Sequence, residues 1–292
     1  MRINTGNNNI YIENITDFKL SDTFDCGQCF RFNPCDDSGY IGTAYGRTVR
    51  ITEDGDTVTL HSTSIDDFNS IWRQFLDLDR DYGCIKHTLT ENSDTVMQAA
   101  IEYGSGIHIL RQELWETVIS FIISASNNIP RIKKIIECLC ESYGTPHTYE
   151  GGTYYSFPNA DTIAALSPDD LACIRAGFRT KYIIACAKAV ASGEFDLNAL
   201  YNMCAQDAKK SLMTLNGVGN KVADCITLFA LNKFNSFPVD VWIKRIMEYC
   251  YFDNQKQSIP TISQFAEKRF GDLGGMAQQY LFFYARSLKI GT

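Results

Sequence analysis

The chain of 292 residues is 45% hydrophobic and 12% aromatic, which excludes an intrinsically disordered protein. Its formal net charge of −7 excludes a surface that is basic throughout, so any nucleic-acid site has to be local. No apolar run reaches the roughly 18 residues that span a bilayer, and the eleven cysteines, most of them within periodic apolar segments, are expected to be reduced thiols.

Residues 1 to about 65 are predicted to form an antiparallel meander of short strands. Runs of β-branched and aromatic residues are separated here by turn sequences such as Asp37-Ser38-Gly39 and Asp54-Gly55-Asp56. The predicted strands cover residues 29–32, 40–45, 48–52 and 57–61.

From Ile65 onward the hydrophobic period becomes helical. Ile132, Ile135, Ile136 and Leu139 follow the spacing of one helix face, while residues 114–125 are apolar nearly all round, as in a buried helix. Further helices are predicted at residues 64–76, 93–103, 161–164, 168–175, 181–192, 207–213, 220–231, 240–250, 262–270 and 276–288. Strands followed by helices indicate an α+β protein. We expect an N-terminal antiparallel β-sheet domain with flanking helices at residues 1–105 and a helical domain at residues 106–292.

Two glycines mark a tight turn between two predicted helices. Gly217 and Gly219 flank Val218, so the backbone can turn and approach a ligand closely. The amides that follow belong to the first turn of a helix and can donate to a phosphate oxygen. A Gly-x-Gly sequence alone also fits an ordinary helix–helix turn.

Lys221 lies at the start of the helix after this turn. The positive end of a helix disfavours a lysine ammonium, which is one way that a lysine becomes a nucleophile. A surface lysine remains the alternative. Asp240 follows Pro238 and precedes a helical run, so it is a predicted N-cap. A carboxylate facing the lysine could also stabilise positive charge on a sugar ring.

These residues resemble a known family. The helix-hairpin-helix at about 207–231 and the Gly/Pro-Asp loop at about 232–240 resemble those of the base-excision DNA glycosylases, and the segment 218–225 resembles their 8-oxoguanine branch. Three more segments resemble that branch. Cys26-Gly27-Gln28-Cys29-Phe30-Arg31 resembles its Gly-Gln-x-Phe-Arg strand. Residues 124–131 resemble its Asn-rich helix junction, and residues 277–282 resemble its last helix.

The resemblance implies a bifunctional DNA glycosylase and AP lyase that removes 8-oxoguanine from duplex DNA. Lys221 would attack C1′ of a nucleotide flipped out of the helix, expel the base and leave a Schiff base that undergoes β-elimination. Asp240 would stabilise the oxocarbenium-like sugar.

The resemblance also implies a base pocket. Phe282 and Cys225 would sandwich the base, and Gln278 would bind its Watson–Crick edge. The carbonyl of Gly27 would attract the proton on N7 of 8-oxoguanine and repel the acceptor that guanine has there. A β-bulge glycine is the alternative interpretation of Gly27.

On the opposite strand, the family uses an asparagine and an Arg/Tyr-Arg pair to read the orphan cytosine. Asn127 or Asn128 would supply the amide, Arg131 and Arg179 match the arginines, and Phe178 stands in place of the tyrosine. Strict alignment places Ser126 where the family has its asparagine. With that amide and the tyrosine hydroxyl both replaced, we expect a weaker preference for cytosine. Gly217 and Gly219 would bind the DNA backbone, with Trp242 in place of a phosphate-binding histidine.

No cofactor is expected to be required. The carbonyls of Met213, Leu215 and Val218 resemble those that bind a structural Na, K, Ca or Mg ion, and no four-cysteine run follows the motif, so no iron–sulfur cluster is expected. We expect an intracellular, cytoplasmic monomer that binds double-stranded DNA and no membrane, associated with the nucleoid if the host is prokaryotic. Two other functions remain open: a glycosylase of the same fold for alkylated or other oxidised bases, and a non-enzymatic DNA-binding module.

Overall fold

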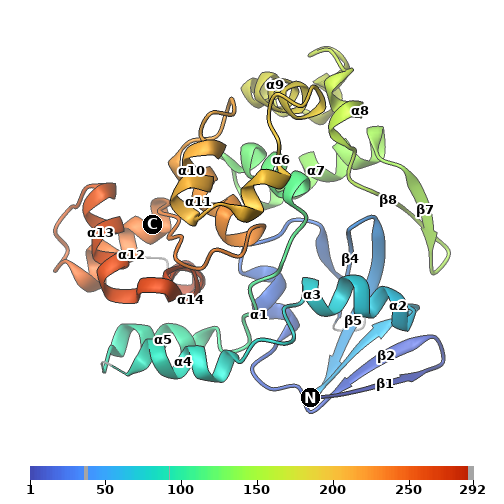
Figure 1. Ribbon diagram of the computed structural model, residues 1–292. Coiled ribbons are helices and arrows are strands. Elements are labelled where there is room, and N and C mark those ends of the chain that lie inside the picture. Colours follow the sequence, from blue (N-terminus) through green and yellow to red (C-terminus); the bar gives the residue numbers. More distant parts are fainter. Residues whose placement is uncertain (36–38, 92, 289–292) are drawn as a thin grey trace.

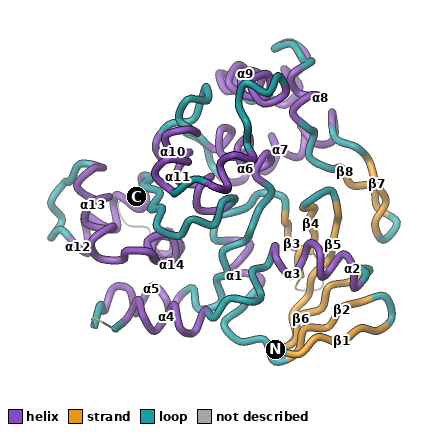
Figure 2. Tube along the Cα trace, in the orientation of Figure 1, coloured by secondary structure: helices purple, strands orange, loops and turns teal. Residues whose placement is uncertain are grey.

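The computed structural model describes residues 1–35, 39–91 and 93–288, and it joins an antiparallel sheet to a larger set of helices (Figure 1). The predicted α+β class is confirmed. Figure 2 shows the strands gathered on one side of the molecule and the later helices on the other. No helix among the described residues has the length and apolarity needed to cross a bilayer.

Six strands form the main sheet, in the order β1-β2-β6-β5-β4-β3. Neighbouring strands are antiparallel, as predicted, and Ile51 pairs with Leu60 on one side and Tyr40 on the other. Their bounds are β1 Arg2–Gly6, β2 Asn9–Glu13, β3 Phe32–Cys35, β4 Gly39–Ala44, β5 Arg47–Asp54 and β6 Thr57–His61.

The sheet differs from the predicted strands in two places. Strands β1 and β2 were not predicted, because their alternation is interrupted by asparagines and by the turn at Asn7 and Asn8. The predicted strand at residues 29–32 is irregular until Phe32, so the Gly-Gln-x-Phe-Arg segment forms a loop instead. Gly27 has φ +83° in this loop, a conformation that does not continue a strand. The predicted turn residues Asp37 and Ser38 lie outside the described residues.

The helices begin with a short one that precedes this loop. The α-helices are α1 Leu20–Asp25, α2 Ile65–Asp67, α3 Arg73–Phe75, α4 Tyr82–Thr90, α5 Thr95–Tyr103, α6 Leu114–Ser124, α7 Ile129–Tyr143, α8 Ala160–Ala164, α9 Thr180–Ala191, α10 Ala205–Leu212, α11 Asn220–Phe229, α12 Val241–Tyr251, α13 Ile259–Phe270 and α14 Gly274–Leu288. A π-helical segment, η1 Phe68–Trp72, joins α2 to α3, and the 3-10 helices are η2 Asp170–Ile174, η3 Gly177–Arg179, η4 Asn198–Asn202 and η5 Gly271–Leu273.

A hairpin of β7 Pro146–Tyr149 and β8 Gly152–Tyr155 interrupts the helical part, which was also not predicted. It packs beside β5: the hydroxyl of Tyr149 accepts a hydrogen bond from the amide of Arg50 at 2.9 Å and donates to the carbonyl of His61 at 2.7 Å.

Two hydrophobic cores hold the chain together. One lies between the sheet and α1 to α3 and contains Phe24, Phe32, Phe68 and Trp72. The other lies among the later helices and includes residues of α4 and α5, the latter packed against α14 (Figure 1). Cys26 and Phe30 belong to the helical core, so the loop after α1 reaches from the sheet into the helices. The domain boundary near residue 105 stays a prediction.

Candidate active site at the end of the hairpin

The turn between α10 and α11 requires glycine at one position. Gly217 has φ +88°, and a Cβ on it would lie 2.7 Å from Cβ of Tyr182, closer than real side chains approach. Gly219 is the N-cap of α11 with an extended backbone, and a Cβ there would meet no atom within 4 Å. The two glycines therefore differ: the first permits the turn, and the second leaves the start of α11 open to a ligand.

This difference predicts unequal effects on stability. Gly217→Ala should lower the free energy of unfolding by about 2 kcal/mol, because it adds a clash to a left-handed backbone. Gly219→Ala should lower it by less than about 1 kcal/mol. Urea denaturation of both variants measures the difference, and equal losses would contradict this account of the turn.

Lys221 lies in the first turn of α11, with its side chain directed at the end of α6. Its Nζ is 3.4 Å from Oγ of Ser124 and 5.2 Å from the centroid of the Phe121 ring. The amine is half-buried between two helices and does not extend freely into solvent. This placement disfavours the alternative of a surface lysine.

Cys225 lies one turn after Lys221 on α11 and is buried. Burial raises the pKa of its thiol to about 11, although the positive charge of Lys221 lowers it in part. Cys225 is therefore a neutral thiol at physiological pH and does not compete with the amine as a nucleophile.

Asp240 is the N-cap of α12, as predicted, and its Oδ1 accepts a hydrogen bond from the amide of Ile243 at 2.8 Å. Burial raises the pKa of this carboxyl above its ordinary value of 3.8, and the bond from Ile243 and the charge of Lys221 both oppose the rise. The carboxylate and the amine thus interact electrostatically inside a shielded site.

A cavity of about 690 Å³ opens in front of these two residues, within the size range of small-molecule sites. It is formed by the end of α6, the starts of α7, α11, α12 and α13, part of α14 and the loop after α1. The predicted residues that line it are Gly27, Asn127, Asn128, Lys221, Asp240, Trp242 and Phe282. Lining residues that were not singled out from the sequence include Phe30, Phe121, Ser124, Lys244, Ile259 and Arg286.

Gly27 and Phe282 lie against each other in the cavity wall. A Cβ on Gly27 would lie 3.1 Å from Cε1 of Phe282 and 3.3 Å from Cδ1 of Ile129. Together with φ +83°, this leaves room only for glycine. Gly27 lies in a loop, so its interpretation as a β-bulge does not hold. The sequence could have predicted that Arg286 lines the cavity, because it follows Phe282 by four residues and so lies on the same face of α14.

Gln278 is only 5% exposed and does not line the open part of the cavity. Its Oε1 is buried and accepts no hydrogen bond from any described residue. A buried acceptor without a donor is unfavourable, so this oxygen needs a donor that the described residues do not supply.

An exposed aromatic ring lies beyond the α6–α7 junction. Phe178 is 56% exposed, and its ring packs against the guanidinium of Arg179 at 4.4 Å and against Tyr182. Arg179 itself is only 3% exposed and donates to the carbonyls of Ala125 and Ser126. Arg179 thus binds the backbone of the α6–α7 junction from inside the protein. Its contact with DNA stays a prediction.

The other predicted DNA contacts have partners within the protein. The Nδ2 of Asn127 donates to the carbonyl of Ile123 at 3.1 Å, and Oδ1 of Asn128 accepts from the amide of Arg131 at 3.0 Å, which caps α7. Arg131 donates to the carbonyl of Arg175 at 3.3 Å. Trp242 packs near the guanidinium of Arg245 at the cavity wall. Direct DNA contacts by these side chains stay predictions.

The carbonyls predicted to bind a cation lie at the hairpin, where that of Leu215 accepts the amide of Val218 at 3.1 Å. Met213 is half-exposed at the end of α10. Among the described residues, no three His, Cys, Asp or Glu side chains cluster as a metal site. A cation held by the hairpin carbonyls stays a prediction.

Comparison with known proteins places this site in a family. Residues 10–118 match the family described as 8-oxoguanine DNA glycosylase, N-terminal domain, and residues 119–271 match the HhH-GPD superfamily base excision DNA repair proteins. A probable N-glycosylase/DNA lyase of Methanothermobacter thermautotrophicus is 30% identical over 66% of this chain and 68% of its own length. The N-glycosylase/DNA lyase OGG1 of Arabidopsis thaliana is 28% identical over 91% of this chain and 77% of its own length.

Solved structures agree over the whole chain. The Clostridium acetobutylicum 8-oxoguanine glycosylase/lyase, bound to double-stranded DNA with cytosine opposite 8-oxoguanine, has a TM-score of 0.96 and 38% identity over 99% of both chains. MBOgg1 in complex with a low-affinity DNA ligand also has a TM-score of 0.96, with 44% identity over 99% of both chains. The chain therefore belongs to the 8-oxoguanine N-glycosylase/DNA lyases of the HhH-GPD superfamily of base excision DNA repair proteins.

Proposed function

We propose that Lys221 carries out both reactions of this 8-oxoguanine DNA glycosylase and AP lyase. The observation that supports this most directly is the position of its amine, which lies at the cavity wall beside Ser124 and within the electrostatic influence of Asp240. A helix-hairpin-helix module that only binds DNA would not need a half-buried lysine whose charge acts on a shielded carboxylate.

This geometry supports the following reaction. The Nζ lone pair bonds to C1′ of the flipped nucleotide as the glycosidic bond breaks, and that bond's electron pair leaves with the base. Asp240 stabilises the positive charge that develops on the sugar. The nitrogen then loses a proton and the sugar ring oxygen gains one as the C1′–O4′ bond breaks, which leaves a Schiff base on Lys221. Loss of a C2′ proton then breaks the C3′–O bond, which releases the 3′ phosphate and nicks the strand.

The base would bind between Phe282 and Cys225, with the Gly27 carbonyl at its N7 edge and Gln278 at its Watson–Crick edge. The unpartnered Oε1 of Gln278 supports this assignment, because the Watson–Crick edge of a purine with an exocyclic amine supplies a donor. The close approach of Gly27 to Phe282 supports it as well.

The duplex would lie across the hairpin and the α6–α7 junction, with Phe178 filling the gap left by the flipped nucleotide. We propose that the protein binds double-stranded DNA as a monomer, associated with the nucleoid if the host is prokaryotic. The start of α11, with Gly217 and Gly219, would bind a phosphate there, and a Na, K, Ca or Mg ion would bind the carbonyls of Met213, Leu215 and Val218.

One experiment separates this function from its alternatives. Borohydride trapping is performed on duplexes that contain 8-oxoguanine, an alkylated purine, another oxidised base or guanine. We expect an adduct with 8-oxoguanine and a far smaller yield with the others. An adduct mainly with the alkylated purine would favour the same-fold alternative, and no adduct with any duplex would favour a binding module.

Phe178 predicts a limited preference for the opposite base. Phe178→Tyr should raise the ratio of excision opposite cytosine to excision opposite adenine by about threefold, because a hydroxyl adds one hydrogen bond to the orphan base. Single-turnover excision rates on the two duplexes measure the ratio. Phe178→Leu, which keeps an apolar wedge without a hydroxyl, is the matched control, and an unchanged ratio in Phe178→Tyr would contradict the prediction.

A further inference from the structure

Three glutamine side chains surround the loop that carries Gly27. We call Gln28, Gln112 and Gln279 the glutamine clamp. The Nε2 of Gln279 donates to the carbonyl of Cys26 at 2.8 Å, and Nε2 of Gln112 donates to the carbonyl of Gln28 at 2.7 Å. The residues before and after Gly27 are therefore each bound by an amide from a different part of the chain.

Gln28 anchors the same loop with its own side chain. Its Nε2 donates to the carbonyls of Thr23 at 2.8 Å and His108 at 2.7 Å, and its Oε1 accepts the amide of Leu110 at 2.9 Å. Gln28 is fully buried and Gln279 is 2% exposed. A hydrogen bond is stronger in the low dielectric of a buried site than in water, so each of these bonds restrains the loop.

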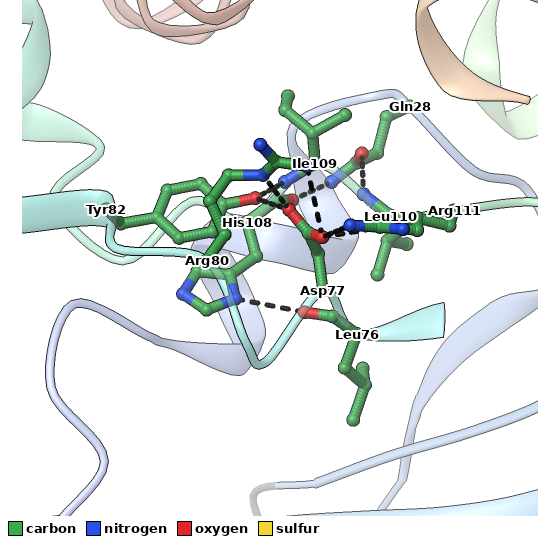
Figure 3. Close-up of polar contacts among 9 residues, drawn as sticks. All are labelled: Gln28, Leu76, Asp77, Arg80, Tyr82, His108, Ile109, Leu110 and Arg111. Carbon is green, nitrogen blue, oxygen red and sulfur yellow. Dashed lines mark hydrogen bonds and ion pairs between the residues drawn. The ribbon is translucent and has the colours of Figure 1, made fainter. Parts of the chain in front are cut away.

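Residues 108–110, to which the side chain of Gln28 is hydrogen-bonded, are themselves fixed by a buried polar network (Figure 3). The amide of Ile109 donates to the hydroxyl of Tyr82 at 2.8 Å, and that hydroxyl donates to Asp77 at 2.9 Å. Arg80 and Arg111 both bind the carboxylate of Asp77, which is 1% exposed. The clamp thus connects the Gly27 loop to a rigid support on one side and, through Gln279, to α14 on the other.

We infer that Gln112 and Gln279 are positioning residues that fix the direction of the Gly27 carbonyl, and that they thereby set the discrimination between 8-oxoguanine and guanine. The inference rests on the proposed role of Gly27 in reading N7. A fixed carbonyl accepts a hydrogen bond from the N7 proton of 8-oxoguanine, and it repels the N7 lone pair of guanine. A carbonyl that can turn away loses the attraction and relieves the repulsion, because glycine offers little resistance to rotation.

Gln279→Met tests this inference, since methionine keeps the length of the side chain and removes the donor to Cys26. We expect single-turnover excision of 8-oxoguanine to fall roughly ten- to hundredfold, which is the scale of a small misplacement in a site. The ratio of excision of 8-oxoguanine to excision of guanine should fall with it. Nicking of duplexes that already contain an abasic site should stay within about twofold of wild type, because no base is read in that reaction.

Two further variants complete the test. Gln112→Met removes the donor on the other side of Gly27 at a partly exposed position, and it should lower the same ratio with little change in melting temperature. Trp115→Phe is the control: it removes a buried N–H that donates to the carbonyl of Pro158 at 2.9 Å. It should leave the excision ratio unchanged. A drop in the excision ratio in both glutamine variants but not in Trp115→Phe supports the inference.

The outcomes that overturn the inference differ from those that overturn the proposed function. Equal losses of 8-oxoguanine excision and abasic-site nicking, or an unchanged ratio in both glutamine variants, would show that the clamp only supports the fold. A wild-type protein that excises guanine as fast as 8-oxoguanine, or forms no adduct, would contradict the proposed function itself.

Discussion

Lys221→Gln should abolish the borohydride-trapped adduct with an 8-oxoguanine duplex and lower base excision on the order of 10³-fold or more, because the side chain that forms the covalent bond is lost. Glutamine retains an amide nitrogen that can donate to Oγ of Ser124, so the pocket should keep its shape. Nicking at preformed abasic sites should be lost as well, since β-elimination proceeds from the same Schiff base.

Lys188→Gln provides the matched control, because Lys188 is an exposed lysine on α9 that lines no part of the cavity. It removes one positive charge without touching the site, so trapping should be unchanged. Duplex affinity measured by fluorescence anisotropy should be similar for both variants. An adduct that persists in Lys221→Gln would mean that another amine is the nucleophile.

Asp240→Asn is expected to lower single-turnover excision by roughly 10²- to 10³-fold, the effect of removing one preorganised electrostatic contact with a transition state. Asparagine is as good an N-cap as aspartate, so the hydrogen bond from Ile243 and the start of α12 should persist. The substitution therefore separates the charge of the residue from its role in the fold. A melting temperature within about 2 °C of wild type would confirm the separation, and excision at the wild-type rate would contradict the electrostatic role.

The same carboxylate predicts a pH dependence. Because burial raises the pKa of Asp240, the carboxyl takes up its proton at a higher pH than an exposed aspartate does. The ionised form is the active one, so excision by the wild type should decline as pH falls through this raised value and should be intact above it. The acidic limb should be absent from the profile of Asp240→Asn, measured from pH 4 to pH 8 by single turnover.

The hairpin, the lysine and the capping aspartate could be predicted from the sequence because each depends on local chemistry. Gly217 and Gly219 mark a turn, Lys221 is at the helix start that follows, and Asp240 satisfies the amides of α12. Helices with a clear apolar face, such as α7, were predicted for the same reason.

What could not be predicted depends on contacts between distant segments. The loop at residues 26–31 reads as a strand from its composition, but its conformation is set by Gln112 and Gln279, which lie more than 80 residues away. Arg179 was predicted from the sequence to contact DNA, yet the fold buries its guanidinium beneath the ring of Phe178 and against two backbone carbonyls. The β7–β8 hairpin depends on β5 for its partners, and its own sequence is short.

The burial of Arg179 has a consequence for how the enzyme measures DNA. Arg179 supports the ring of Phe178 on one side and holds Ala125 and Ser126 on the other, while the adjacent Ser124 contacts the amine of Lys221. The protein thus fixes the distance between the ring proposed to enter the duplex and the amine proposed to attack the sugar. This fixed distance would bring only the nucleotide next to the inserted ring within reach of Lys221, so the enzyme would locate its target by distance as well as by chemistry.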